Sequence, residues 1–197
     1  MNIHKLMENL EKRGFTTAHF AAKEEAVSYL QSQISGKTVA FGGSMTLKEM
    51  GLDKALAENN TVIWHWNEPG RETLLKAREA EVYLCSANAV AETGELVNID
   101  GTGNRVSMTL FGPEKLYFVV GVNKIAEDLP AAMERARNVA APKNAVRIGG
   151  KTPCAVKGDK CYRCESPDNI CHATVILERP VNGMKAEVVL IDEELGY

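Results

Sequence analysis

The feature that most constrains the fold of this chain is the alternation of short apolar runs with longer segments whose apolar residues recur at helical spacing. The short runs, typical of buried strands, are residues 37–41, 61–66, 81–85 and 116–121. The segments with helical spacing are residues 3–10, 26–34, 46–56, 71–80 and 129–140. Buried strands separated by helices favour a parallel sheet that is covered on both faces. The predicted fold class is therefore α/β, with a mostly parallel sheet flanked by helices.

The middle of the chain departs from this alternation. Ala89–Ala91 and Glu95–Ile99 are joined by Glu92-Thr93-Gly94, which predicts a β-hairpin. Two further apolar runs, 173–177 and 186–191, are typical of late strands. The chain has 197 residues, no internal repeat and no convincing linker, so we expect one domain over residues 1–197.

Charge and hydropathy exclude several classes of function. Lys and Arg number 23 against 26 for Asp and Glu, a net charge of −3, which lacks the basic excess of a nucleic-acid binder. No apolar run is long enough to predict a membrane span. The N-terminal residues alternate apolar and charged types and do not resemble a signal segment, so a cytoplasmic location is expected. Five cysteines in that reducing compartment argue against a disulfide framework.

A first candidate binding loop follows the predicted strand at 37–41. Glycines at 42 and 43 let the backbone approach a ligand, and hydroxyls follow at Ser44 and Thr46. The alternative is an ordinary tight turn in which Ser44 caps the next helix. The loop has neither the Gly-Lys-Ser/Thr ending of a Walker loop nor the G-x-G-x-x-G pattern. From the sequence, both interpretations stay open.

A second candidate loop, residues 98–105, is richer in polar groups. It contains Asn98, Asp100, Gly101, Gly103, Asn104 and Arg105. The glycines permit a nest of backbone N–H groups for an anion, and the arginine can grip a carboxylate or phosphate through two hydrogen bonds. The alternative is a surface turn that satisfies its own backbone. Because the carboxyl ends of parallel strands meet at one edge, we expect both loops to line one cleft for a small anionic ligand.

Weaker candidates lie near the same predicted edge. Asn123 and Lys124 follow the strand at 116–121, where the lysine could bind an anion or simply be solvated. His65, between two tryptophans, could be an acid–base group, although a structural histidine is the more common case. Cys85 ends an apolar run and is expected to pack as a small hydrophobic residue.

Four cysteines crowd into one irregular segment near the C-terminus. They are Cys154, Cys161, Cys164 and Cys171, with six, two and six residues between them. Four thiolates suit a tetrahedral zinc ion or an iron–sulfur cluster, and a Cys-x2-Cys pair also occurs in redox pairs. The density predicts a metal centre over residues 154–171, and the spacing leaves the metal open.

Several ordered motifs resemble the LUD (lactate-utilisation) domain family. They are Gly42-Gly43-Ser44-Met45-Thr46-Leu47, Ser86-Ala87-Asn88-Ala89, Glu92-x-Gly94-Glu95-Leu96-Val97-Asn98, Asp100-Gly-x-Gly-Asn104-Arg105, Phe111-Gly112-Pro113, Gly121-x-Asn123-Lys124, Ala141-Pro142 and the terminal cysteines. The resemblance implies a fold related to the sugar-phosphate isomerase, CoA-transferase and methenyltetrahydrofolate-synthetase group. It also implies a link to bacterial lactate oxidation, in which family members act beside iron–sulfur subunits.

Three functional hypotheses follow. The first is an accessory or electron-transfer component of organic-acid (lactate) oxidation, with an iron–sulfur cluster, most simply 4Fe–4S, on the four cysteines and other lactate-oxidation redox subunits as partners. The second is an enzyme that binds a nucleotide, CoA or folate-like anion and carries a structural zinc. The third is a non-enzymatic partner protein whose metal only fixes the C-terminal segment. The family resemblance, and not the cysteine spacing, favours the first.

Overall fold

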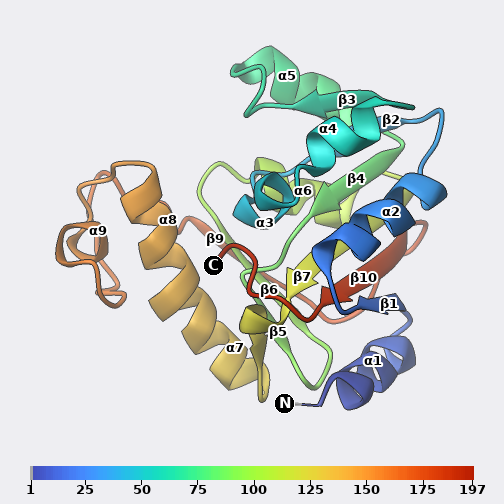
Figure 1. Cartoon of the computed structure of the whole chain (residues 1–197). Helices are drawn as coiled ribbons and strands as arrows, with labels where there is room; N and C mark the ends of the chain where they lie inside the picture. The colour runs from blue at the N-terminus through green and yellow to red at the C-terminus, as the bar shows by residue number, and fades with distance from the viewer. Residues whose placement is uncertain (1) are drawn as a thin grey trace.

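A computed structural model describes residues 2–197, and its centre is a six-stranded sheet in which all strands run parallel (Figure 1). The strands are β1 (Thr16–Phe20), β2 (Thr38–Phe41), β3 (Thr61–Trp64), β4 (Val82–Cys85), β7 (Lys115–Gly121) and β10 (Lys185–Ile191). Their order across the sheet is β1-β10-β7-β4-β2-β3, with parallel register between all neighbours. The predicted α/β class with a mostly parallel sheet is confirmed.

Alternate residues of these strands enter two different cores, as the period of two in a strand requires. Val39 and Phe41 of β2 face one core, and Ala40 faces the other. The first core is covered by α2 (Lys23–Gln33), α3 (Met45–Glu49) and α4 (Leu52–Ala57). The second is covered by α1 (Ile3–Lys12), α6 (Asn104–Leu110) and a second sheet. The six-stranded parallel sheet is therefore buried on both faces, which explains its nearly continuous apolar strands.

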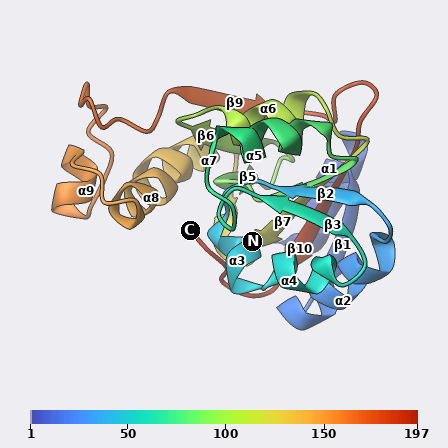
Figure 2. The ribbon, with the colours of Figure 1, turned by 90° about the horizontal axis from the view of Figure 1, so that it is seen from above.

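The predicted hairpin belongs to the second sheet, of order β8-β5-β6-β9. Its strands are β5 (Ala89–Ala91), β6 (Leu96–Asp100), β8 (Ile125–Ala126) and β9 (Ala173–Leu177). The far face of β5 and β6 packs on α7 (Leu129–Arg135), so the molecule is layered as helices, sheet, sheet and helix (Figure 2).

Two helices differ from the sequence prediction. The segment 46–56 is two helices, because Gly51 adopts φ 63° and starts α4 in a left-handed conformation. The helix expected to end at Ala141-Pro142 instead runs on as α8 (Ala141–Arg147). A π-helical turn at residues 136–140 precedes the proline, with the Ala141 N–H donating to the Ala136 carbonyl. This wider turn continues the helix across a residue that lacks an N–H donor.

Beyond α8, the chain forms an arm that stands away from the sheets (Figures 1 and 2). It contains α9 (Pro153–Lys157), and β9 leads back from it to the second sheet. At the β3 edge of the parallel sheet, α5 (Arg71–Lys76) follows β3. Within residues 2–197, every helix is too short or too polar to span a lipid bilayer.

Candidate functional site

A cleft of about 240 Å³ opens where β2, β4 and β7 end and faces α8 and the arm. Both candidate loops reach it, as expected from the carboxyl ends of parallel strands. The second loop, however, follows β6 of the smaller sheet and not a strand of the parallel sheet. Predicted ligand residues that line the cleft are Gly43, Ser44, Asp100, Gly101, Asn104, Arg105 and Lys124. Predicted residues outside the lining are Gly42, Thr46, Asn98, Gly103 and Asn123.

The first loop has the structure of a capped helix start. The Ser44 hydroxyl accepts a hydrogen bond from the Leu47 N–H at 3.3 Å, so its predicted capping role is present, and the same residue lines the cleft. Gly43 lies under the Trp66 indole, where an added Cβ would be 3.2 Å from the ring nitrogen. The glycine therefore allows the tryptophan to close one side of the cleft.

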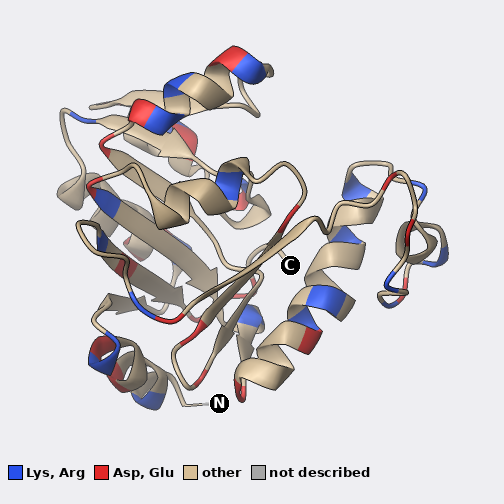
Figure 3. Ribbon diagram, turned by 180° about the vertical axis from the view of Figure 1, so that it is seen from behind, with Lys and Arg blue, Asp and Glu red and all other residues tan. Residues whose placement is uncertain are grey.

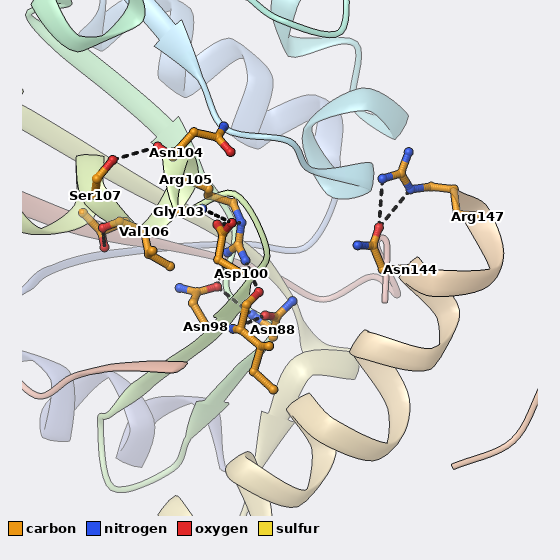
Figure 4. A network of polar contacts seen from close by, with 12 residues as sticks. Asn88, Asn98, Asp100, Gly103, Asn104, Arg105, Val106, Ser107, Asn144 and Arg147 are labelled. Atoms are coloured by element: carbon orange, nitrogen blue, oxygen red, sulfur yellow. Dashed lines mark hydrogen bonds and ion pairs between the residues drawn. The ribbon is translucent and has the colours of Figure 1, made fainter. Parts of the chain in front are cut away.

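Polar side chains of the second loop hold one another in a network (Figure 4). The Arg105 guanidinium donates to Asn98 Oδ1 and, at 2.7 Å, to the Ile99 carbonyl. Its Nε lies 3.5 Å from Asp100 Oδ2. Gly103, at φ 82°, donates its N–H to Asp100 Oδ1 at 2.8 Å. The loop is thus internally bonded, and Asn98 acts as a support for Arg105.

Asp100 keeps one oxygen without a hydrogen bond. The residue is 7% exposed, and Oδ2 has no hydrogen-bond donor among residues 2–197 apart from the long ion pair with Arg105. A buried carboxylate oxygen without a donor is unfavourable by about 1–3 kcal/mol or more. Asp100 lines the cleft, so its carboxylate lies beside the space that a ligand would fill.

Lys124 lies at the bottom of the cleft, where it is 3% exposed. Its Nζ donates to the hydroxyls of Thr46 and Ser86 at 2.7 and 2.9 Å. Burial, followed by the positive charges of the nearby Arg135 and Arg105, lowers the pKa of this lysine from 10.5 to about 7. The group can therefore exist as a neutral amine near neutral pH.

Asn123 has a different environment from its neighbour. Its Nδ2 donates to the Gly196 carbonyl at 3.2 Å, and its Oδ1 accepts from the Leu195 N–H at 3.1 Å. Both amide atoms thus hold the C-terminal segment against the molecule. That segment brings Tyr197 to the lining of the cleft, where its hydroxyl donates to Asn144 Oδ1 at 3.2 Å.

Several lining residues were missed or set aside at the level of sequence. Arg147 and Asn144 lie on α8, beyond the point where the sequence pattern predicted the helix of residues 129–140 to end. Figure 4 shows both residues across the cleft from Asp100. The Arg147 guanidinium stacks 4.8 Å from the Trp66 ring centre. His65 also lines the cleft, and burial lowers its pKa, against an opposing influence of Asp100. The tryptophans on either side of His65 were the feature of the sequence that could have indicated its place at the cleft.

Cys85 packs as predicted, fully buried at the end of β4, and burial raises its pKa to about 12. The remaining four cysteines all carry free, partly buried thiols. Burial, followed by the nearby charges of Cys161, Cys154 and Cys164, raises the pKa of Cys171 to about 11. Cys171 thus lies within electrostatic range of the other three cysteines. Among residues 2–197, no three Cys, His, Asp or Glu side chains are drawn together as a ready metal site.

Three of the four cysteine sulfurs of the segment have a hydrogen-bond partner. The Arg163 N–H donates to Cys161 Sγ at 3.3 Å within the Cys-x2-Cys turn, and Arg163 adopts φ 49°, rare for a residue with a side chain. The Asn169 amide lies 3.8 Å from Cys164 Sγ. The Thr152 hydroxyl lies 3.2 Å from Cys154 Sγ. Hydrogen bonds of this kind orient ligand sulfurs and tune bound clusters.

The cysteine segment and the cleft share a wall. Cys171 and Ile170 both line the cleft. An added Cβ on Gly101 would lie 3.1 Å from the Ile170 carbonyl, so the second loop needs a glycine at its contact with the segment. Cys154, Cys161 and Cys164 lie outside the lining.

Fold and cleft together define an α/β protein with a small polar site at the ends of parallel strands. A protein-family model described as the LUD domain matches residues 3–191. The chain therefore belongs to the LUD domain family and is a protein of the lactate-utilisation type. It is similar to the crystal structure of a DUF162 family protein from Deinococcus radiodurans, with a TM-score of 0.57, 14% identity and coverage of 96% of this chain and 95% of that chain. At that identity the likeness shows the fold alone. No curated protein matches the chain.

Proposed function

We propose that this protein is an accessory or electron-transfer component of bacterial organic-acid (lactate) oxidation. It binds a small anionic ligand in the cleft and holds an iron–sulfur cluster, most simply 4Fe–4S, on Cys154, Cys161, Cys164 and Cys171. The observation that carries the proposal is that Cys171 belongs both to the cysteine segment and to the cleft wall. A cluster there would supply one-electron transfer directly beside the ligand.

The charges of the cleft favour a small acid. Arg105, Arg147 and, when protonated, Lys124 line it, against the single carboxylate of Asp100. A guanidinium can bind a carboxylate through two parallel hydrogen bonds. The volume of about 240 Å³ lies below the range of about 300–1,000 Å³ that is usual for drug-sized ligands. A short organic acid therefore suits the cleft better than a nucleotide or CoA.

The surface of the arm favours docking of an acidic redox partner. Its exposed cations, together with those of α8, are Lys143, Arg147, Lys151, Lys157, Lys160 and Arg163. They outnumber the exposed carboxylates of the arm, which are Asp159, Glu165 and Asp168, and Figure 3 shows this side of the molecule by charge. Val156, on α9, is 74% exposed among them. Complementary charge speeds the encounter of two proteins, and an exposed apolar residue at the centre adds contact area.

Zinc remains the alternative occupant, because four thiolates also suit a structural zinc ion. In that case the protein would be a ligand-binding enzyme that uses Lys124 or His65 as acid–base groups. The burial of Lys124 in the cleft, which lowers the pKa of its amine, is the observation that favours this second function.

Metal analysis of the full chain distinguishes the two. Protein expressed and purified without oxygen is expected to be brown, to contain iron and acid-labile sulfide, and to lose visible absorption on reduction with dithionite. Colourless protein with stoichiometric zinc would instead support the enzyme alternative. Protein without either metal would contradict both, provided that the thiols are shown to be reduced by labelling.

A further inference from the structure

The hydrogen bonds of Lys124 are compatible with a neutral amine. The Thr46 hydroxyl donates to the Leu195 carbonyl at 3.0 Å, and the Ser86 hydroxyl points to the Ala87 carbonyl at 3.5 Å. With their protons so directed, both hydroxyl oxygens accept from Lys124. A neutral amine has two N–H bonds and one lone pair, so these two acceptors leave the lone pair free.

The charges around Lys124 also favour the neutral amine. Among the ion pairs of residues 2–197, none includes Lys124, in contrast to the partly buried Lys115, which lies 2.6 Å from Glu187. Arg135 on α7 and Arg105 on α6 disfavour its protonation, whereas Glu49 on α3 and Cys85 on β4 oppose them. Burial contributes most to the lowered pKa, about 7. Desolvated lysines of this kind are nucleophiles toward carbonyl groups.

We infer that Lys124 is a nucleophilic residue that forms an imine with the carbonyl carbon of a small 2-oxo acid bound in the cleft. Nζ attacks the carbonyl carbon and forms a C–N bond. The carbonyl oxygen then leaves as water with the two hydrogens of the amine, and a C=N bond remains. No electrons are gained or lost, so the step needs no oxidant or reductant.

The rest of the cleft explains why a 2-oxo acid is the substrate class. In such a compound the carboxylate carbon is bonded directly to the carbonyl carbon. Arg105 and Arg147, which can bind the carboxylate, line the same cleft as Lys124. A 2-hydroxy acid could bind the same cations but has no carbonyl carbon for the amine. This inference rests on the proposed role of the cleft in binding a small acid, and it is independent of the metal on the cysteines.

Borohydride trapping tests the inference on the full chain. The protein is incubated with pyruvate, as the 2-oxo acid probe, and reduced with sodium cyanoborohydride. Intact mass is expected to increase by one reduced pyruvate adduct, and peptide mapping is expected to locate it on Lys124. The rate of trapping should rise with pH through about 7, because the amine loses its proton there. Lactate should give no adduct.

Two variants and a binding measurement complete the test. Lys124→Met should reduce trapping to the level without pyruvate, and Lys48→Arg, which alters an exposed lysine beside Trp66, should leave it unchanged. Pyruvate that binds by calorimetry without an adduct on Lys124 of the wild-type protein would overturn the imine but leave acid binding intact. Adducts spread evenly over surface lysines would also overturn it. Absence of both binding and adduct would contradict the proposed small-acid function as well.

Discussion

Cys161→Ser is expected to abolish incorporation of the proposed metal centre and to leave the two sheets folded. A four-thiolate site that loses one ligand loses most of its affinity, because binding and ordering of the segment are coupled. Cys161 is also the cysteine that receives the Arg163 N–H in the Cys-x2-Cys turn. Iron and sulfide after anaerobic expression should fall from stoichiometric to background, and proteolysis should become faster in the arm.

Cys85→Ala provides the matched control for this variant. Cys85 is fully buried in the core and lies outside the cleft lining and the cysteine segment, so its loss should leave the metal content unchanged. Full metal occupancy in Cys161→Ser would show that the four cysteines do not form a single site.

Lys124→Met is expected to remove a pH dependence from the stability of the protein. The folded state lowers the pKa of Lys124 from 10.5 to about 7, so between these values the unfolded chain binds more protons. Stability attributable to this residue therefore rises with pH, and the penalty for the buried ammonium is complete below about pH 7. We expect the wild type to gain about 2 kcal/mol relative to the variant between about pH 7 and pH 9, by denaturant unfolding.

Other groups titrate in the same pH range, so the comparison needs a control variant in which an exposed lysine is replaced. Lys48→Met removes an exposed lysine and should leave the pH dependence of the wild type unaltered. Subtraction of the Lys124→Met curve from the wild-type curve also cancels the contribution of the cysteine thiols, which both proteins share. Of these thiols, Cys85 and Cys171 have raised pKa values in the folded state. Identical pH dependence in wild type and Lys124→Met would show that Lys124 is protonated throughout.

Much of the fold was predictable because strand and helix periods are local properties. The runs at 37–41, 81–85 and 116–121 all became central strands of the parallel sheet. The order of the strands was not predictable, because it depends on pairing between distant segments. β10, which ends at Ile191, inserts between β1 and β7. Loss of the proposed metal should therefore loosen the arm and β9, and not β10.

The site was predictable only in part, for a similar reason. Glycine-rich loops after strands predicted Gly43, Ser44 and Asp100 as ligand residues, and all three line the cleft. Arg147 was missed because a proline normally ends a helix, whereas a π-helical turn accommodates this one. The contact between the cysteine segment and the second loop joins residues distant in sequence, and only the tertiary structure reveals it.

We propose that the cleft and the cysteine segment form one functional site through Cys171. The most direct measurement is the electron paramagnetic resonance spectrum of the anaerobically prepared, dithionite-reduced protein, with and without saturating lactate. Lactate would bind against the cleft wall that contains Cys171, a proposed cluster-binding cysteine. Lactate should therefore change the g-values or line shape of the signal. A signal that stays identical, while calorimetry shows that lactate is bound, would show that the cleft and the cysteine segment do not form one site.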